Sequence, residues 1–127
     1  MRLGARTTFL REGSLGAHIY GATTISERHR HRYEVNPALV PRLEEAGLTF
    51  SGKDESGLRA EVIELDPERF DHPFFFGLQG HPEYKSRPLL PSPPFLAFVR
   101  AAGRDREVSA VAVRGAAAAA SRAQAST

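Results

Sequence analysis

A histidine and a glutamate two residues apart, His81 and Glu83, form the pattern with the clearest chemical meaning in this chain. A carboxylate beside an imidazole selects the tautomer of the ring and stabilises its protonated form, as in the base and orienting acid of a nucleophilic triad. Pro82 lies between them and fixes φ. The same spacing also fits a plain turn with two exposed polar side chains, and both interpretations stay open on spacing alone.

A nucleophile that would complete such a triad is missing from the sequence. The chain has no cysteine, which excludes a thiol nucleophile, a disulfide and a zinc knuckle within it. The segment Gly13-Ser14-Leu15-Gly16 is not a nucleophile elbow, because Glu12 occupies the position of the first glycine in Gly-x-Ser-x-Gly. Glycine-rich phosphate-binding loops are also absent. The residues therefore predict one half of a catalytic site.

Arginine and histidine alternate over residues 28–32. In extended backbone, three arginines would lie on one face and His29 and His31 on the other. The arginine face suits an anion or a carboxylate, and it also fits a solvated edge strand. A His-x-His metal site lacks a third ligand at convincing spacing, so we expect no metal. Because Glu27 and Glu34 partly neutralise this segment, we expect no nucleic acid as a partner.

Length and composition indicate one ordinary domain or less. The chain has 127 residues, 41% of them hydrophobic, and a formal net charge of only +2. No apolar stretch approaches the roughly 20 residues that span a bilayer, and arginines interrupt every hydrophobic run at the amino terminus. We therefore expect no membrane association and a cytoplasmic location.

The elements that must position His81 can be read from hydrophobic patterns and turn residues. The apolar run at 73–80 predicts a buried strand that ends at the histidine. Asn36 and Pro37 predict the start of a helix that ends before Gly47. Further predictions are a strand at 7–10, an antiparallel hairpin of 48–52 and 59–65, and a loop at 66–73.

The last part of the chain predicts one more helix and then a low-complexity segment. Ser92 can cap a helix that ends at Gly103 and whose apolar residues are Phe95, Leu96, Phe98 and Val99. Residues 103–127 are mostly Ala, Ser and Arg, and we expect this tail to be disordered, because an isolated helix of that length is marginal in water. The predicted division is a domain at 1–102 and a tail at 103–127.

Four segments in order resemble CTP synthase, in the carboxy-terminal part of its glutamine amidotransferase domain. The histidine-proline-glutamate element is shared by many triad glutaminases, whereas the stretch Arg-His-Arg-His-Arg-Tyr-Glu-Val-Asn is specific to CTP synthases. The resemblance covers roughly residues 1–102, and the four segments are 1–4, 27–37, 81–88 and 91–96.

This resemblance implies an α/β fold of the class I glutamine amidotransferase-like (flavodoxin-like) type, of which the chain holds the carboxy-terminal portion only. His81 would be the general base of L-glutamine hydrolysis, Glu83 would orient it, and Arg32 would hold the substrate glutamine. No cofactor is implied within this chain. The complete enzyme is expected to use ATP and Mg²⁺ to convert UTP to CTP and to be a homo-oligomer.

Departures from the family pattern are as informative as the matches. The family's nucleophilic cysteine and its ATP- and UTP-binding domain lie upstream of the segment at residues 1–4, so we expect the chain to be a fragment and inactive alone. Gly80 replaces a residue that is usually aromatic, which is expected to loosen packing beside His81. The alternative hypothesis is a noncatalytic interaction or regulatory module that docks on the remainder of CTP synthase.

Overall fold

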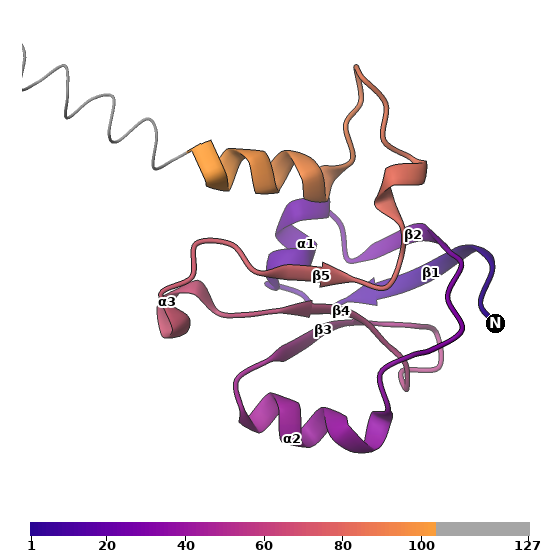
Figure 1. Ribbon diagram of the computed structural model, residues 1–127, viewed down its shortest axis with the longest axis vertical. Helices are drawn as coiled ribbons and strands as arrows, with labels where there is room; N and C mark the ends of the chain where they lie inside the picture. Colours follow the sequence, from indigo (N-terminus) through magenta and orange to yellow (C-terminus); the bar gives the residue numbers. More distant parts are fainter. Residues whose placement is uncertain (104–127) are drawn as a thin grey trace, which may run out of the picture.

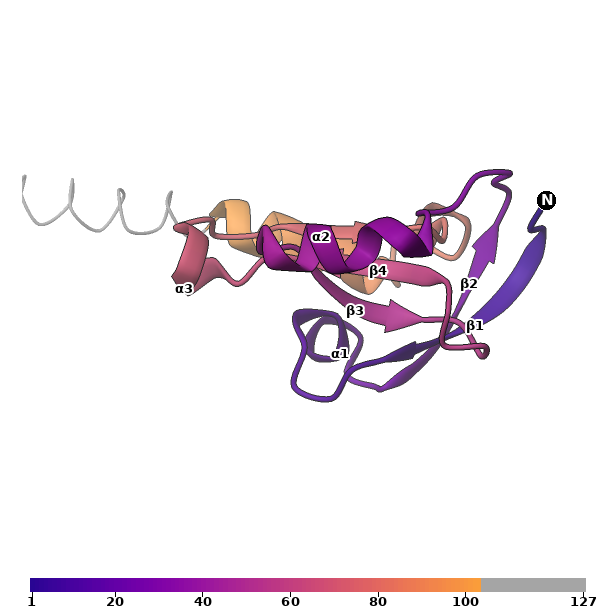
Figure 2. The ribbon, with the colours of Figure 1, turned by 90° about the horizontal axis from the view of Figure 1, so that it is seen from below.

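One antiparallel sheet of five strands forms the centre of the protein, and the computed structural model describes residues 1–103 (Figure 1). The strands are β1 (Gly4–Leu10), β2 (Thr24–His29), β3 (Thr49–Lys53), β4 (Ala60–Glu64) and β5 (Phe76–Leu78), in the order β2-β1-β3-β4-β5. The helices are α1 (Leu15–Tyr20), α2 (Val40–Glu45) and α3 (Pro67–Phe70), the 3-10 turns η1 (Pro37–Leu39) and η2 (Pro82–Tyr84), and a last helix from residue 93 to 103. Figure 2 shows α1 and α2 on opposite sides of the β3–β4 pair.

The sheet is curled, so that its two edges meet beside the predicted histidine. After β5, the Gln79 N–H donates to the Glu61 carbonyl of β4, and two residues later the His81 N–H donates to the Arg28 carbonyl of β2. Strands β2 and β4 are separated in the sheet by β1 and β3, which pair over only two residues, Phe9↔Lys53 and Leu10↔Gly52. Because β1 and β3 separate beyond this short ladder, side chains of β2 and β4 can contact each other.

The predicted helix at 37–46 is confirmed as η1 followed by α2. The Asn36 side chain accepts the N–H of Ala38, as an N-cap does. At the other end Gly47 has φ +104°, its N–H donates to the Glu44 carbonyl, and the Leu48 N–H donates to the Leu43 carbonyl. This is a Schellman motif, whose left-handed residue favours glycine.

Helix α1 is anchored to the sheet by a buried carboxylate that the sequence did not reveal. Glu64 on β4 accepts the N–H groups of Leu15 and Gly16, and Ser51 Oγ donates to it at 2.7 Å. Ser14 caps the same helix by accepting the Ala17 N–H. The first-turn amides of α1 therefore have acceptors inside the domain, and the carboxylate is satisfied by them.

A small apolar core lies between α1 and the sheet. Its buried members in the described residues are Leu10, Ile25 and Val62, and Ala17, Tyr20, Phe76 and Leu78 pack against them. Gly52 lies so close to Val62 that a Cβ would approach the valine Cγ2 to 2.5 Å, and the β3–β4 register shifts there. The predicted strand at 7–10 and the hairpin of 48–52 and 59–65 are confirmed as β1 and β3–β4.

Two expectations were wrong, those of a buried strand at 73–80 and of a loop throughout 66–73. The run at 73–80 yields only the three-residue strand β5, which is half-buried at the edge of the sheet, since nothing in the described residues pairs with its outer side. The helix expected after Ser92 is confirmed over residues 93–103, and its apolar residues Phe95, Leu96, Phe98 and Val99 are exposed. The loop expected at 66–73 contains the short helix α3. Apolar patterns predict where an element forms. They do not predict whether another element covers its apolar side chains.

The predicted tail at 103–127 lies outside the described residues except for residue 103, which is still helical. In the described part of the chain, no helix is long and apolar enough to cross a bilayer.

Candidate functional site

The predicted pair of His81 and Glu83 is in contact. His81 Nδ1 lies 2.7 Å from Glu83 Oε1. His81 directly precedes η2, and its backbone N–H is held by the Arg28 carbonyl at 2.8 Å, so the ring is placed by both edges of the curled sheet. The pair closes through the 3-10 turn that begins at Pro82 rather than through extended backbone. The outcome matches the sequence prediction, although the local conformation differs.

The pair is accessible to a substrate. The side chains of His81 and Glu83 are 29% and 52% exposed. The hydrogen bond from His81 lowers the pKa of the Glu83 carboxyl below its ordinary value. An ionised Glu83 that accepts from Nδ1 leaves Nε2 of the imidazole as the basic nitrogen. The geometry can therefore perform general base catalysis at Nε2.

An arginine–tyrosine contact borders this pair. The His81 and Tyr84 ring centroids are 5.6 Å apart. Arg30 donates to the Tyr84 hydroxyl at 2.9 Å, and the Arg28 guanidinium lies 5.6 Å from the centroid of the same ring. As predicted, the arginines of residues 28–32 are exposed and the histidines face inward. Two arginines of β2 and its extension thus hold the turn that follows His81.

Arg32 forms neither a hydrogen bond nor an ion pair with His81 or Glu83. It is exposed in the segment that follows β2, and within the described residues it forms no hydrogen bond and no ion pair. Its guanidinium is consequently available to a ligand, but the structure does not bring it into the histidine–glutamate pair. Its assignment to the substrate carboxylate stays a prediction.

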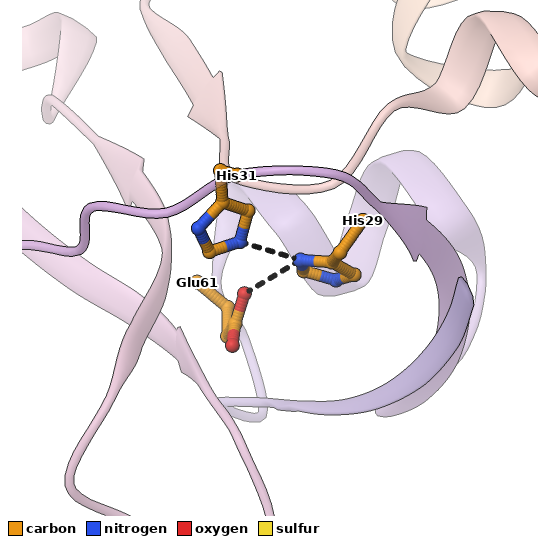
Figure 3. Close-up of side chains that lie close together, drawn as sticks. All are labelled: His29, His31 and Glu61. Carbon is orange, nitrogen blue, oxygen red and sulfur yellow. Dashed lines mark hydrogen bonds and ion pairs between the residues drawn. The ribbon is translucent and has the colours of Figure 1, made fainter. Parts of the chain in front are cut away.

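A second imidazole–carboxylate group, which the sequence analysis missed, lies inside the domain (Figure 3). His29 Nδ1 lies 2.9 Å from His31 Nε2 and 3.7 Å from Glu61 Oε2. Glu61 belongs to β4, thirty residues after His31, so no local spacing could show it as a third ligand. The signal within β4 was a glutamate between apolar neighbours, in a strand whose residues are almost all buried.

Burial shifts both titrating groups of this cluster. Burial, followed by the charge of Arg2, lowers the pKa of His29 to about 4. Burial raises the pKa of Glu61 despite the hydrogen bond from Arg2. Both shifts favour neutral forms, as expected for groups removed from water.

Ion pairs extend from this cluster to the surface. Arg2 binds Glu61 through Nη1 and lies near Glu34 through Nε. Glu34 also pairs with Arg59 at 3.0 Å, and Arg59 pairs with Asp54 at 2.8 Å. The chain of alternating charges links the segment before β1, the segment after β2, β4 and the β3–β4 turn.

The expectation that Gly80 loosens the packing beside His81 was wrong, because neighbouring atoms lie close to the glycine. A Cβ there would approach the Glu27 Cβ to 2.7 Å and His29 Nε2 to 3.5 Å. Because the nearer atom adjoins the β2 backbone, a larger residue at 80 would require β2 to shift.

Comparisons with known proteins are consistent with this geometry. The chain matches the family Glutamine amidotransferase class-I over residues 2–101. It therefore belongs to the class-I glutamine amidotransferases, and the predicted fold class is confirmed.

Within that family, the chain is similar to the glutaminase part of CTP synthases. It is 57% identical over 102 residues to the CTP synthase of Sulfurisphaera tokodaii and 57% identical over 106 residues to that of Neurospora crassa. These matches cover 80% of this chain and 18% of each relative. A solved structure, the glutaminase domain of Trypanosoma brucei CTPS with bound acivicin, matches with a TM-score of 0.74 and 39% identity, over 82% of this chain and 40% of that chain.

Proposed function

We propose that this chain supplies the histidine–glutamate half of a glutamine-hydrolysing site that produces ammonia for CTP synthesis. The observation that carries this proposal is the 2.7 Å contact between His81 Nδ1 and Glu83 Oε1 in an accessible position, in a chain whose relatives are CTP synthases. An exposed polar turn would not require the two side chains to meet.

The chemistry follows from the orientation of the pair. Glu83 accepts from Nδ1, so Nε2 of His81 takes the proton of a cysteine thiol. The thiolate attacks the side-chain amide carbon of L-glutamine, and ammonia leaves with the proton that His81 returns, which produces a thioester. Water deprotonated by His81 then hydrolyses the thioester to glutamate and the free thiol. We assign Arg32 to the α-carboxylate of glutamine, because a guanidinium can bind a carboxylate through two parallel hydrogen bonds.

The thiol must come from outside these 127 residues, since they contain no cysteine. We propose that the remainder of a CTP synthase supplies it, and that this chain is inactive alone. ATP, Mg²⁺ and UTP would bind in that remainder, because these residues include no glycine-rich phosphate-binding loop. The assembled protein would be a cytoplasmic homo-oligomer that makes CTP in pyrimidine nucleotide biosynthesis.

The second candidate function is a noncatalytic module that docks on a CTP synthase. The specific observation in its favour is a set of exposed apolar side chains on the last described segment. These are Leu89, Leu90, Phe95, Leu96, Phe98 and Val99. Exposed apolar side chains mark interaction surfaces where they form a contiguous patch, and these six lie within a dozen residues of one another along the chain.

Both candidates can be tested by mixing the chain with a cysteine-bearing upstream segment of a related CTP synthase. We expect no ammonia release from glutamine by either piece alone, and release by the complex. His81→Ala should abolish it, whereas the control His72→Ala, at an exposed histidine away from the pair, should not.

Ammonia release by the isolated chain that survives His81→Ala would refute the catalytic assignment. Size-exclusion chromatography of the same mixture separates the candidates. A stable complex without ammonia release would favour the docking module.

A further inference from the structure

Three potential metal-ligating atoms converge where β2 approaches β4 (Figure 3). They are His29 Nδ1, His31 Nε2 and a carboxylate oxygen of Glu61, and all lie within 4.8 Å of one another. His29 and Glu61 are buried and His31 is half-buried. The group is separate from the His81–Glu83 pair, so the inference below does not depend on the proposed function.

The outer partner of His31 determines which ring nitrogen faces the cluster. His31 Nδ1 lies 2.9 Å from the Tyr33 carbonyl oxygen, which can only accept a hydrogen bond. Nδ1 therefore carries the proton, and Nε2 directs a lone pair at His29. Metal-ligating histidines show the same arrangement, in which the second nitrogen donates to a carbonyl or carboxylate and holds the ring in place.

One oxygen of Glu61 has no partner although its side chain is only 1% exposed. Arg2 binds Oε1, whereas Oε2 is buried without a hydrogen bond and lies 3.7 Å from His29 Nδ1. A buried carboxylate oxygen without a partner is costly, and a cation would satisfy it. Glu61 Oε2 is therefore an available third ligand on the side of the two imidazoles.

The charges around the cluster leave room for a cation. The connected ion pairs hold three carboxylates, Asp54, Glu34 and Glu61, and two guanidiniums, Arg2 and Arg59. With neutral imidazoles this network carries one excess negative charge. Arg2 is the nearest opposing charge, and it engages the oxygen of Glu61 that faces away from the histidines.

We propose that His29, His31 and Glu61 form a structural site for a divalent transition-metal ion of the zinc class, which fastens β2 to β4. Two imidazoles and one carboxylate are a ligand set that suits Zn²⁺. Tetrahedral ligands with bonds of about 2.0–2.2 Å lie about 3.3 Å apart. Two observed separations, 2.9 Å between the imidazoles and 3.7 Å from His29 to Glu61, bracket that value, and all three ligand atoms lie within 4.8 Å of one another, so binding would draw the ligands together around the ion.

The location suggests what such an ion would stabilise. Glu61 belongs to β4, which also holds the end of β5 through the hydrogen bond from the Gln79 N–H to the Glu61 carbonyl. Residue 80 is a glycine that directly precedes His81. A Cβ at this position would lie 3.5 Å from His29 Nε2, so the cluster lies close to the backbone beside His81. The ion would hold the point where the two edges of the curled sheet meet.

The test uses the complete 127-residue chain, stripped with a chelator and titrated with Zn²⁺ by calorimetry and with Co²⁺ by visible absorption. We expect one ion per chain, the intense d–d bands of tetrahedral Co²⁺, and a higher melting temperature with Zn²⁺. His31→Gln and Glu61→Gln should each weaken Zn²⁺ binding by at least about 10–100-fold, the loss seen when even an outer partner is removed. The matched control is His18→Ala, an exposed histidine on α1 that should bind Zn²⁺ as the unaltered chain does.

Absence of stoichiometric binding, or an equal loss in His18→Ala, would overturn the proposal. Nitrogen-15 NMR of the unaltered chain provides a readout that does not depend on variants that fail to fold. Zn²⁺ should shift the resonances of His29 Nδ1 and His31 Nε2 first. Shifts confined to His18, His72 or His81 would mean that the ion binds only at surface histidines, and would also overturn it.

Discussion

The protein contains two imidazole–carboxylate groups, the His81–Glu83 pair and the cluster of His29, His31 and Glu61, which differ in how deeply they are buried. The side chains of His81 and Glu83 are 29% and 52% exposed, whereas those of His29 and Glu61 are each 1% exposed. In the exposed pair the hydrogen bond from His81 lowers the pKa of Glu83, and in the buried group desolvation raises the pKa of Glu61. The first group can therefore keep its carboxylate charged for acid–base chemistry, while the second depends on its neighbours for stability.

The difference also concerns how each group is assembled. His81 and Glu83 meet through a single 3-10 turn, so their contact needs little beyond local backbone. His29 and Glu61 meet only because β2 and β4 converge across a curled sheet. Changes at the exposed pair should therefore affect turnover with little effect on folding, and changes in the buried group should do the reverse.

The largest expected effect is on turnover at the exposed pair. In the complex with a cysteine-bearing segment, Glu83→Gln should lower kcat for glutamine hydrolysis by up to about 10⁴-fold, because His81 would lose the acceptor that sets its tautomer. The free energy of unfolding should change by no more than about 0.5 kcal/mol, as for other exposed substitutions. Steady-state ammonia assays and urea unfolding measure the two effects, with Glu12→Gln as an exposed control. An unchanged kcat would remove Glu83 from the mechanism.

The next effect is on folding at the buried group. Glu61→Ala leaves Arg2 and His29 without their carboxylate and should lower the free energy of unfolding by about 3–5 kcal/mol, as when one partner of a buried ion pair is removed. Urea denaturation followed by circular dichroism measures this loss. Glu45→Ala, at an exposed position that ends α2, is the matched control and should be close to neutral. A loss as small as that of the control would show that the buried network contributes little.

The smallest effect concerns Asp54, the end of the ion-pair chain that lies farthest from His29 in the order of pairs. Burial would raise the pKa of Asp54, but hydrogen bonds from Ser56 and Arg59 outweigh it and lower the pKa from 3.8 to about 2. A carboxyl with a depressed folded-state pKa stabilises the fold fully above its unfolded pKa and loses this contribution as pH falls. Stability should therefore decline between about pH 4 and pH 2.

Asp54→Asn tests this origin of the acid sensitivity. The variant should lose about 1.5–3 kcal/mol at neutral pH, the range for hydrogen bonds to charged groups, and should show a flatter stability profile below pH 4. Thermal unfolding across pH 2–7 provides the measurement. An unaltered profile would assign the acid transition to other carboxylates.

The prediction of the fold from sequence was most accurate where local signals agree. Asn36, Pro37 and Gly47 bounded the helix at 37–46 because caps depend on neighbouring backbone groups. The β3–β4 hairpin followed from two apolar segments around the turn at 54–57. The buried strand expected at 73–80 was wrong, because burial depends on which other elements cover a segment.

The sequence by itself determined that His81 meets Glu83, since residues two apart in a tight turn meet with little help from the rest of the fold. The sequence also showed the relationship to CTP synthases, through four segments that resemble that family in the same order. Only the tertiary structure decided that Glu61 joins His29 and His31. The physical reason is that strand order and sheet curvature set distances between residues far apart in sequence, and a local pattern contains neither quantity.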